Sequence, residues 1–278
     1  MKKVLIVGSG SYIGESFSKY AADKFEITTV DARDNAWQEH DFTGYDSVLH
    51  VAGIAHVKTT KENERLYYDV NCGLAVEVAK KAKTDGVKQF VFLSSLYVYG
   101  FRSTCFINKE TPLIPDTVYG KSKYMAEQEL QKLRDKSFTL CFVRPPMVYG
   151  ENCKGNFPSL VKLAKLMPVF PDFPNKRSMI YINNLCQHIC NLIEVEYEGV
   201  TTPHNSEYVN TTELVRAIRK CLGKRTMTTR LFNPVIRILV KHISTVNKLF
   251  GDLRYEMQGD ERTYATVEFE DGVKMGVL

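Results

Sequence analysis

The segment KKVLIVGSGSYIGES, residues 2–16, sets the pattern for the first half of the chain. Its apolar run Val4–Val7 predicts a short strand, and the glycines at positions 8, 10 and 14 predict a tight turn that opens a helix. Glycine lets a backbone approach phosphate groups closely, and a helix N-terminus presents N–H donors and partial positive charge. The segment therefore predicts a strand–turn–helix unit with a dinucleotide phosphate site at its turn.

Strand and helix patterns continue to alternate up to about residue 146. The predicted strands are nearly unbroken apolar runs, which is typical of a parallel sheet covered by helices on both faces. We therefore predict an α/β fold, a Rossmann-like doubly wound parallel sheet, in which ligands bind at the carboxyl ends of the strands. The predicted elements are strands at 2–7, 25–31, 45–53, 88–95 and 138–146, and helices at 11–24, at 62–83 and around 118–127.

The character of the sequence changes after about residue 150. We expect residues 1–150 to form the dinucleotide-binding domain, with part of 178–195 returning to it, and residues 151–278 to form a smaller C-terminal lobe beside a substrate cleft. Three prolines in PVFPDFPNK, residues 168–176, predict a loop there. In the lobe, Asn210 and Glu213 are spaced as a capping box at the start of a helix.

Composition excludes several classes of protein. The chain has 278 residues, a net charge of +5 and no long basic run, so we expect no nucleic-acid binding. No segment reaches the roughly 18 consecutive apolar residues of a membrane span, and the first apolar run is shorter than a secretory core of ~7–15 residues. The seven cysteines lack CxxC pairs and are expected to be reduced thiols without a metal. We therefore expect a cytoplasmic protein.

Asp31 ends the second predicted strand, 17 residues after Gly14. A carboxylate at this point of a βαβ unit can accept hydrogen bonds from both ribose hydroxyls of NAD, and it repels the 2′-phosphate of NADP. Asp31 therefore favours NAD, while Arg33 two residues later leaves NADP open. The alternative is an ordinary turn residue at a strand end.

Several further segments together resemble one enzyme family. They are HVAG at 50–53, Asp41-Phe42, Asn71 in YYDVN, FLSSLYVYG at 92–100 and YGKSK at 119–123. From residue 1 to about 190 the chain resembles the extended short-chain dehydrogenases/reductases of the NAD-dependent epimerase/dehydratase family, of the UDP-glucose 4-epimerase type. One departure is Ser11, which stands where the family has the middle glycine of its phosphate turn.

The resemblance assigns functional residues. It implies a catalytic set of Ser95, Tyr119 and Lys123. It also implies NAD-binding positions at Gly8, Gly10, Ser11, Tyr12, Ile13, Gly14, Asp31, Asp41, Phe42, Val51, Ala52, Gly53, Asn71, Tyr119 and Lys123, with Asp41 and Phe42 at the adenine.

Tyr119 and Lys123 are four residues apart, which places both side chains on one face of a helix. Tyr20 and Lys24 have the same spacing, but they end the first predicted helix, whereas Tyr119 and Lys123 follow the fourth strand, at the edge expected for the nicotinamide. A free tyrosine has a pKa near ~10, and an ammonium and the positive nicotinamide would both lower it. We expect Tyr119 to take a proton from a sugar hydroxyl, Ser95 to hold the sugar oxygen and Lys123 to bind the nicotinamide ribose.

His50 lies at the end of the third predicted strand. A catalytic role is less favoured there than a hydrogen bond to the backbone.

The type of reaction depends on the residues after Ser95. The family's 4,6-dehydratases have an Asp-Glu pair at the positions of Leu96 and Tyr97, so dehydration is not expected here. Two reactions remain, a 4-epimerase that retains NAD and an NAD(P)H-dependent 4-keto-sugar reductase. A non-catalytic dinucleotide-binding protein is less favoured, because Ser95, Tyr119 and Lys123 are all present.

The substrate is inferred from two segments of the second half. RPPMVYGENCKGNF, 144–157, and NKRSMIYINN, 175–184, resemble nucleotide-sugar-binding segments of UDP-N-acetylhexosamine epimerases and reductases from polysaccharide pathways. By that match Asn156 contacts the UDP portion and Arg177 clamps the diphosphate, while Ser95 also contacts the sugar. We expect a UDP-hexose or UDP-N-acetylhexosamine as the substrate, and a homodimer as the assembly.

The segment NPVIRILVKHISTVNKLF, 233–250, has apolar residues at helical spacing among basic ones. We favour a helix packed on the smaller lobe, without membrane association. The alternative is a basic amphipathic surface that rests on a membrane.

Overall fold

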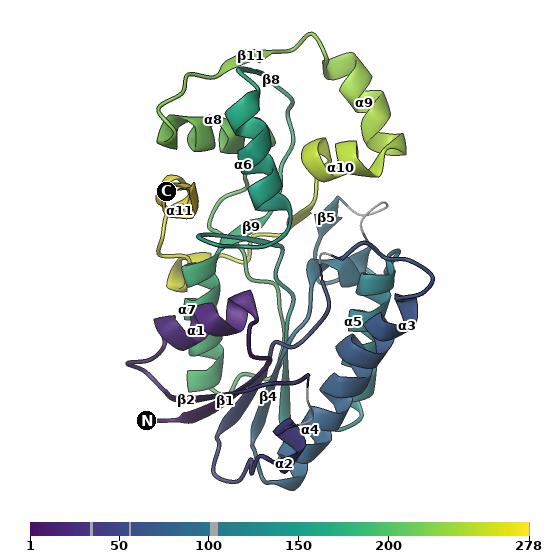
Figure 1. Ribbon diagram of the computed structural model, residues 1–278, viewed down its shortest axis with the longest axis vertical. Coiled ribbons are helices and arrows are strands. Elements are labelled where there is room, and N and C mark those ends of the chain that lie inside the picture. Colours follow the sequence, from purple (N-terminus) through teal and green to yellow (C-terminus); the bar gives the residue numbers. More distant parts are fainter. Residues whose placement is uncertain (34–35, 56, 101–104, 278) are drawn as a thin grey trace. The chain divides into compact units, whose positions relative to one another are not determined.

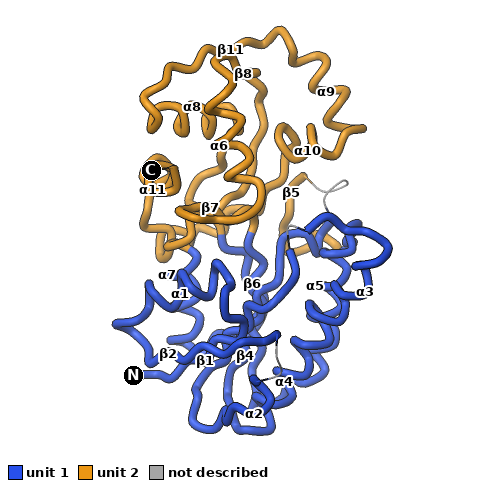
Figure 2. The backbone as a smooth tube through the Cα atoms, viewed as in Figure 1, with its two compact units in different colours: residues 1–100, 113–145, 185–203 blue, residues 101–112, 146–184, 204–278 orange. Residues whose placement is uncertain are grey.

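The computed structural model describes residues 1–33, 36–55, 57–100 and 105–277. The chain forms two compact units, which Figure 2 shows in different colours. Unit 1 comprises residues 1–100, 113–145 and 185–203, and unit 2 comprises residues 101–112, 146–184 and 204–278. Each unit is therefore assembled from three segments that are separated in the sequence.

Unit 1 is built on a six-stranded sheet in which all neighbouring strands are parallel. The strand order is β10-β6-β4-β3-β1-β2. The strands are β1 (Lys3–Val7), β2 (Glu26–Val30), β3 (Ser47–His50), β4 (Gln89–Leu93), β6 (Thr139–Val143) and β10 (Gly199–Thr201). This confirms the predicted fold class. The order reverses between β1 and β3, so the ligand-binding crevice of such sheets is expected at the carboxyl ends of these two strands.

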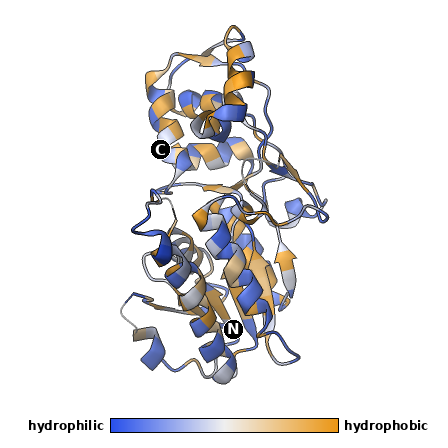
Figure 3. Cartoon of the chain, turned by 90° about the vertical axis from the view of Figure 1, so that its right-hand side faces the viewer, coloured by the Kyte–Doolittle hydropathy of each residue, from blue (hydrophilic) through white to orange (hydrophobic). Residues whose placement is uncertain are grey.

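Helices cover both faces of this sheet. In Figure 1, α1 and α7 lie on one face, and α4 and α5 lie on the other. The helices are α1 (Tyr12–Tyr20), α2 (Ala36–Glu39), α3 (Glu64–Tyr68), α4 (Ala75–Thr84), α5 (Val118–Gln131) and α7 (Ile182–Glu194). Strands buried on both faces need the unbroken apolar runs seen in the sequence, and the central strands are coloured mostly hydrophobic in Figure 3.

The helix predicted for 62–83 forms from Glu64 to Thr84 but contains an irregular turn. Residues Asp69–Leu74 form one π-helical turn between α3 and α4. Such turns are rare and are found frequently at functional sites. Here the turn carries Asn71, one of the expected cofactor-binding residues.

Unit 2 consists of short strand pairs and helices. β7 (Met147–Tyr149) pairs with β9 (Met179–Tyr181), and β5 (Phe106–Ile107) pairs with β12 (Arg254–Tyr255). β8 (Val169–Pro171) pairs with β11 (Met227–Thr229), so the prediction of a loop throughout 168–176 was wrong at its start. The helices are α6 (Asn156–Leu166), α8 (Thr211–Cys221), α9 (Asn233–His242), α10 (Ser244–Phe250) and α11 (Phe269–Val277).

Two local predictions in unit 2 are tested directly. The capping box of α8 is present, because the Asn210 side chain accepts from the Glu213 N–H and the Glu213 side chain accepts from the Asn210 N–H. The helix expected over 233–250 is split at Ile243, whose extended backbone separates α9 from α10. None of the helices formed by the described residues is both long and apolar enough to cross a bilayer.

α5 packs against the turn of residues Leu96–Tyr99 at Gly120. A methyl group at Gly120 would overlap the backbone carbonyl oxygen of Tyr97, which cannot rotate away. Gly120→Ala should therefore lower the free energy of unfolding by ~2 kcal/mol or more, although alanine favours a helix by ~1 kcal/mol over glycine. Urea denaturation measures this change.

Gly73→Ala is the matched control. Apart from the helix's own adjacent backbone, the nearest described atom to the added methyl group is the Tyr68 carbonyl oxygen at 3.9 Å, so this variant should be neutral or more stable than the wild type. Equal stability of the Gly120→Ala variant and the wild type would contradict the close packing of α5 on this turn.

Candidate active site

The turn after β1 lies against the segment after β3. Gly8 has a φ of 127°, and a β-carbon there would lie 2.6 Å from the backbone nitrogen of Ala52. The Val51 and Ala52 N–H groups both donate to the Val7 carbonyl at 3.0 Å. Only glycine fits at position 8, and its absent side chain brings the two turns together at the carboxyl edge of the sheet.

The position that departs from the family's glycine pattern has a structural role. Ser11 is the N-cap of α1, and its hydroxyl accepts from the Gly14 N–H at 3.5 Å. Tyr12 and Ile13 follow as the first residues of the helix, and Gly14 is buried. At Gly10, with a φ of 75°, the space around a β-carbon is open to 4 Å. The turn can therefore receive a phosphate at the N-terminus of α1.

Asp31 lies at the carboxyl end of β2, on the same edge, and forms an ion pair with Arg33. Its Oδ1 accepts from the Arg33 backbone N–H at 2.9 Å and from Arg33 Nε at 3.0 Å. These hydrogen bonds hold the pKa of Asp31 well below its usual range. The carboxylate is thus ionised, but a cation lies beside it, so its preference for NAD over NADP is weaker than its charge alone implies.

Asp41 and Phe42 are not brought together with the other cofactor residues. Asp41 lines a hollow with Lys3 and Glu26, which are the first residues of β1 and β2, at the amino edge of the sheet. Phe42 is fully buried in the core, and its N–H donates to Asp85. The expected adenine contact is therefore not supported. The physical reason is that this pair lies in the segment that enters β3 at the amino edge.

The catalytic set begins with Ser95 and Tyr119. Ser95 follows β4 and caps the turn of residues Leu96–Tyr99, and Tyr119 lies in the first turn of α5. The Tyr119 ring lies edge-on to Tyr97 at 5.9 Å between centroids. Burial raises the pKa of Tyr119 to about 12, and the nearby hydroxyl of Ser95 partly opposes this shift. The protein alone therefore keeps this phenol protonated.

Lys123 is buried beside this pair. Its Nζ donates to the Leu93 carbonyl at 2.8 Å and lies 4.6 Å from the centre of the Phe92 ring. Burial lowers the pKa of Lys123 to about 8, and the charge of Glu127 partly opposes this shift. Lys123 is not among the groups that shift the pKa of Tyr119. The expected lowering of that pKa is therefore absent in the protein by itself.

Asn71 links α5 to the segment after β3. Its Oδ1 accepts from the Ile54 N–H at 2.7 Å, and its Nδ2 donates to the Ile54 carbonyl at 3.1 Å and to Ser122 Oγ at 2.9 Å. Ser122 in turn donates to the Tyr119 carbonyl at 2.9 Å. Asn71 is completely buried, so its role in this structure is to position the helix that carries Tyr119 and Lys123.

A buried ion pair that the sequence reasoning missed supports the same edge. Arg144, one residue beyond β6, donates to both carboxylate oxygens of Glu127 on α5, through Nε at 3.0 Å and Nη2 at 2.5 Å. Ser94 donates to Glu127 Oε1, and Arg144 Nη1 donates to the Tyr99 hydroxyl at 2.8 Å. Two features of the sequence could have indicated this pair. Glu127 follows Lys123 by one helical turn, and Arg144 directly follows an apolar strand.

The second Tyr–Lys pair has a structural role. The Tyr20 hydroxyl donates to Gln187 Oε1 at 2.9 Å, and Lys24 Nζ donates to the same atom at 2.8 Å. Both residues thereby tie the end of α1 to α7.

The expectation for His50 was wrong. Its ring stacks between Phe90 and Phe92, and among the described residues neither ring nitrogen has a hydrogen-bond partner. Burial, with the charge of Lys123, lowers its pKa to about 3. The neutral ring acts as a core side chain.

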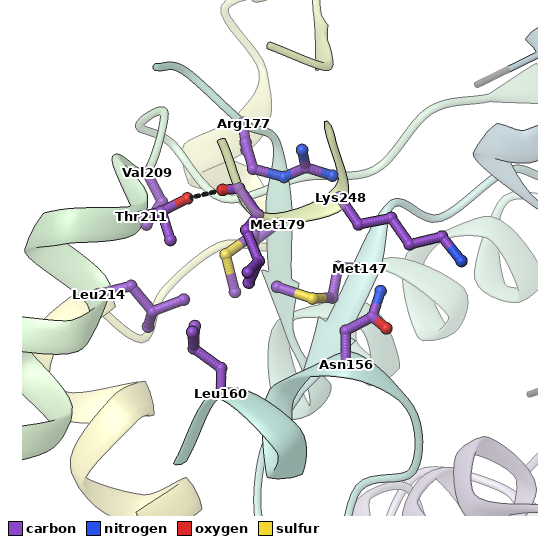
Figure 4. A pocket seen from close by; sticks show the side chains of 10 residues that line it. Met147, Asn156, Leu160, Arg177, Met179, Val209, Thr211, Leu214 and Lys248 are labelled. Atoms are coloured by element: carbon purple, nitrogen blue, oxygen red, sulfur yellow. Dashed lines mark hydrogen bonds between the residues drawn. The ribbon is translucent and has the colours of Figure 1, made fainter. Parts of the chain in front are cut away.

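The two expected substrate residues of unit 2 line one cavity, shown in Figure 4. Asn156 begins α6, and the Arg177 Nη1 donates to the Gly251 carbonyl at 2.8 Å, at the end of α10. Lys248 lines the same cavity, and no motif in the sequence had indicated it. The cavity has a volume of about 30 Å³, enough for water but not for a nucleotide, so a nucleotide must displace side chains to enter.

The rest of the cavity wall is mostly apolar. The Thr211 hydroxyl donates to the Leu249 carbonyl there, which is the dashed line in Figure 4. The other lining residues are Met147, Leu160, Met179, Val209 and Leu214.

Comparison with known proteins gives consistent results. The sequence profile of the NAD dependent epimerase/dehydratase family matches residues 4–207. A protein named UDP-glucose 4-epimerase from Vibrio cholerae is 32% identical over 81% of this chain and 77% of its own length. A protein named N-acetyl-alpha-D-glucosaminyl-diphospho-ditrans,octacis-undecaprenol 4-epimerase from Escherichia coli O157:H7 is 29% identical over 80% of this chain and 73% of its own.

A solved structure shows the same fold. The UDP-glucuronic acid 4-epimerase of Bacillus cereus, solved in complex with NAD, superimposes with a TM-score of 0.76 at 15% identity, over 99% of this chain and 95% of that one.

The buried ammonium of Lys123 predicts a specific dependence of stability on pH. The folded pKa is about 8, and the unfolded value is ~10.4. Between these values the unfolded chain binds one more proton than the folded protein, so the free energy of unfolding rises with pH, by about 3 kcal/mol in total. Relative to Lys123→Met, the wild type should therefore become more stable as the pH is raised from 7 to 9.5, as measured by urea denaturation.

Lys121→Met, which changes an exposed lysine on the same helix, should give a curve parallel to that of the wild type. Parallel curves for Lys123→Met and the wild type would show that the Lys123 ammonium is not desolvated.

Proposed function

The chain belongs to the NAD-dependent epimerase/dehydratase family, and from that premise we propose that it is a redox-neutral 4-epimerase of a UDP-hexose or UDP-N-acetylhexosamine. The observation that carries the proposal is the placement of the Tyr119 phenol near the Ser95 hydroxyl, with Lys123 buried beside them. All three lie at the carboxyl edge of the sheet, where the turns after β1 and β3 meet.

The residues at this edge fit NAD. The open space at Gly10 and the N-terminus of α1 suit the pyrophosphate, and Asp31 suits the adenosine ribose. Bound NAD would supply the acceptor for the C4 hydrogen with its electron pair, and a positive charge near the phenol.

Proton transfer is assigned to Tyr119. The pKa of about 12 in the protein alone is too high for a base at neutral pH, so the phenol is activated only when a positive charge arrives beside it. Tyr119 then takes the proton of the C4 hydroxyl while Ser95 holds the sugar oxygen by hydrogen bonding. After the 4-keto sugar has turned, the hydrogen with its electron pair would return to the opposite face of C4 while Tyr119 returns a proton to the oxygen, so the alcohol re-forms with the opposite configuration.

Lys123 is placed to orient rather than to transfer protons. Its carbonyl partner Leu93 fixes the ammonium at the end of β4. The Lys123 ammonium is thus desolvated and held in place before a ribose hydroxyl binds, which reduces the entropic cost of ordering the lysine side chain on binding.

The substrate's diphosphate is assigned to unit 2. Asn156, Arg177 and Lys248 supply an amide and two cations to one cavity. The two named 4-epimerase relatives act, by their names, on a UDP sugar and on a lipid diphosphate sugar, so a sugar diphosphate is common to both. The expected homodimer and the cytoplasmic location remain predictions.

A second candidate is the NAD(P)H-dependent reductase of a UDP-4-keto sugar. It would use the same Ser95, Tyr119 and Lys123. The ion pair of Arg33 with Asp31 favours it, because Arg33 could turn to a 2′-phosphate of NADP.

The test is interconversion of sugars without added reduced coenzyme. Purified protein, supplied with NAD, should epimerise at least one of UDP-glucose, UDP-galactose, their N-acetyl forms or N-acetylglucosaminyl-diphospho-undecaprenol, followed by NMR. Tyr119→Phe should lower the rate by about 10³-fold or more while retaining NAD affinity, because only the proton-transferring oxygen is lost.

Tyr20→Phe, the matched control, should keep full activity, because the Tyr20 hydroxyl bonds Gln187 on α7 and not a residue of the proposed catalytic set. Absence of any epimer, together with NAD(P)H-dependent reduction of a UDP-4-keto sugar, would replace the epimerase with the reductase.

A further inference from the structure

Unit 2 exposes a row of large apolar side chains at α9. The α9 ridge comprises Leu231, Phe232, Val235, Ile238 and Ile243, and their exposed fractions range from 43% at Ile243 to 78% at Leu231. α9 packs on the lobe through the buried Ile236 and the half-buried Leu239 and Val240, so the expected packing covers one face and leaves the other apolar side chains exposed. Exposed apolar side chains gathered on one short segment indicate an interaction site.

The ridge follows helical geometry. Val235 and Ile238 are three residues apart on one face of α9, Leu231 lies in the turn just before the helix, and the buried Ile236 lies on another face. Arg237 and Lys241 are exposed four residues apart and form a basic stripe. The surface of α9 therefore has three parts: a face packed on the core, a basic stripe and an exposed apolar face.

The ridge segment itself carries only positive charge. From residue 230 to residue 251 the sequence contains four cations, Arg230, Arg237, Lys241 and Lys248, and no aspartate or glutamate. Arg230 is paired with Asp172, so the exposed cations of α9 are Arg237 and Lys241. The chain as a whole has 32 acidic residues among 278, so their absence from this segment sets it apart from the rest of the surface. A complementary surface must offer apolar groups and negative charge together.

We propose that the α9 ridge rests on the surface of an anionic phospholipid bilayer. The ten residues of α9 extend about 15 Å, about half of what a bilayer core requires, so the helix would lie in the plane of the interface. Its apolar side chains would enter the boundary between headgroups and acyl chains, and Arg237 and Lys241 would contact the lipid phosphates.

A second copy of the chain fits this surface less well. A twofold interface centred on the ridge would place Arg237 and Lys241 near the same cations of the copy, with no acidic residue in the segment to pair with them. An anionic bilayer offers both apolar acyl chains and negative charge.

The ridge is joined to the cavity of unit 2 by the chain. α10 follows α9 after Ile243 and contributes Lys248 and Leu249 to the cavity wall. Attachment through α9 would therefore hold this cavity close to the lipid headgroups. The proposal does not depend on which reaction Tyr119 carries out.

The test is co-sedimentation of the purified full chain with sonicated vesicles at 50 mM salt. The protein should sediment with vesicles of phosphatidylcholine containing 30% phosphatidylglycerol and remain in the supernatant with phosphatidylcholine alone. Raising the salt to 500 mM should release most of it, because the ion contacts are screened.

Two variants separate the apolar and ionic parts. Ile238→Ser should weaken partitioning roughly tenfold, and the double variant Arg237→Gln, Lys241→Gln should weaken it roughly 30-fold, at about 1 kcal/mol per cation. Ile114→Ser is the matched control, because Ile114 is 61% exposed and Ile238 is 62% exposed. It should bind as the wild type does. Thermal melts and activity on a water-soluble substrate should be unchanged in all variants.

Three outcomes would overturn the proposal. The first is a wild type that stays in the supernatant with anionic vesicles. The second is equal partitioning of Ile238→Ser and Ile114→Ser. The third is a dimer in light scattering that Ile238→Ser alone dissociates, which would assign the ridge to a second copy.

Discussion

The buried ion pair of Glu127 and Arg144 is the constraint on which the catalytic edge depends. It joins α5, which carries Tyr119 and Lys123, to the end of β6, and through Ser94 and Tyr99 it reaches both sides of Ser95. An isolated buried charge is costly, whereas a pair with every partner satisfied is tolerated and fixes a unique geometry. Three elements from separate parts of unit 1 thereby hold the proposed catalytic residues at fixed positions.

The same arrangement explains why the protein alone does not activate its base. Lys123 bonds to Leu93, and burial raises the pKa of Tyr119 to about 12. The phenol becomes a base only after a positive charge is added at the edge, which couples proton removal to occupancy of the cofactor site. This coupling protects the site from proton transfer in the absence of cofactor, and it suits an enzyme that retains its cofactor through the cycle.

Much of this architecture could be predicted from the sequence, because periodicity reports burial directly. The unbroken strands gave the parallel sheet, and the turn at Gly8 together with the pair Tyr119 and Lys123 placed the site at its carboxyl edge. The remainder depended on where side chains meet in space. Asp41 resembles a cofactor contact in sequence but lies at the opposite edge, and the Glu127–Arg144 pair joins residues 17 positions apart that no local pattern connects. The exposure of the α9 ridge was not predicted, because helical spacing indicates that a helix has an apolar face but not whether that face is covered.

The central claim is that the C4 hydrogen leaves the sugar and returns to the same carbon on the opposite face. The most direct measurement uses a UDP-sugar substrate with deuterium at C4, incubated with the NAD-loaded protein and no reduced coenzyme, and NMR of both epimers at equilibrium. The account predicts that deuterium remains at C4 in substrate and product alike. Loss of the label to solvent hydrogen at C4, or product that appears only when NADH or NADPH is supplied, would contradict it.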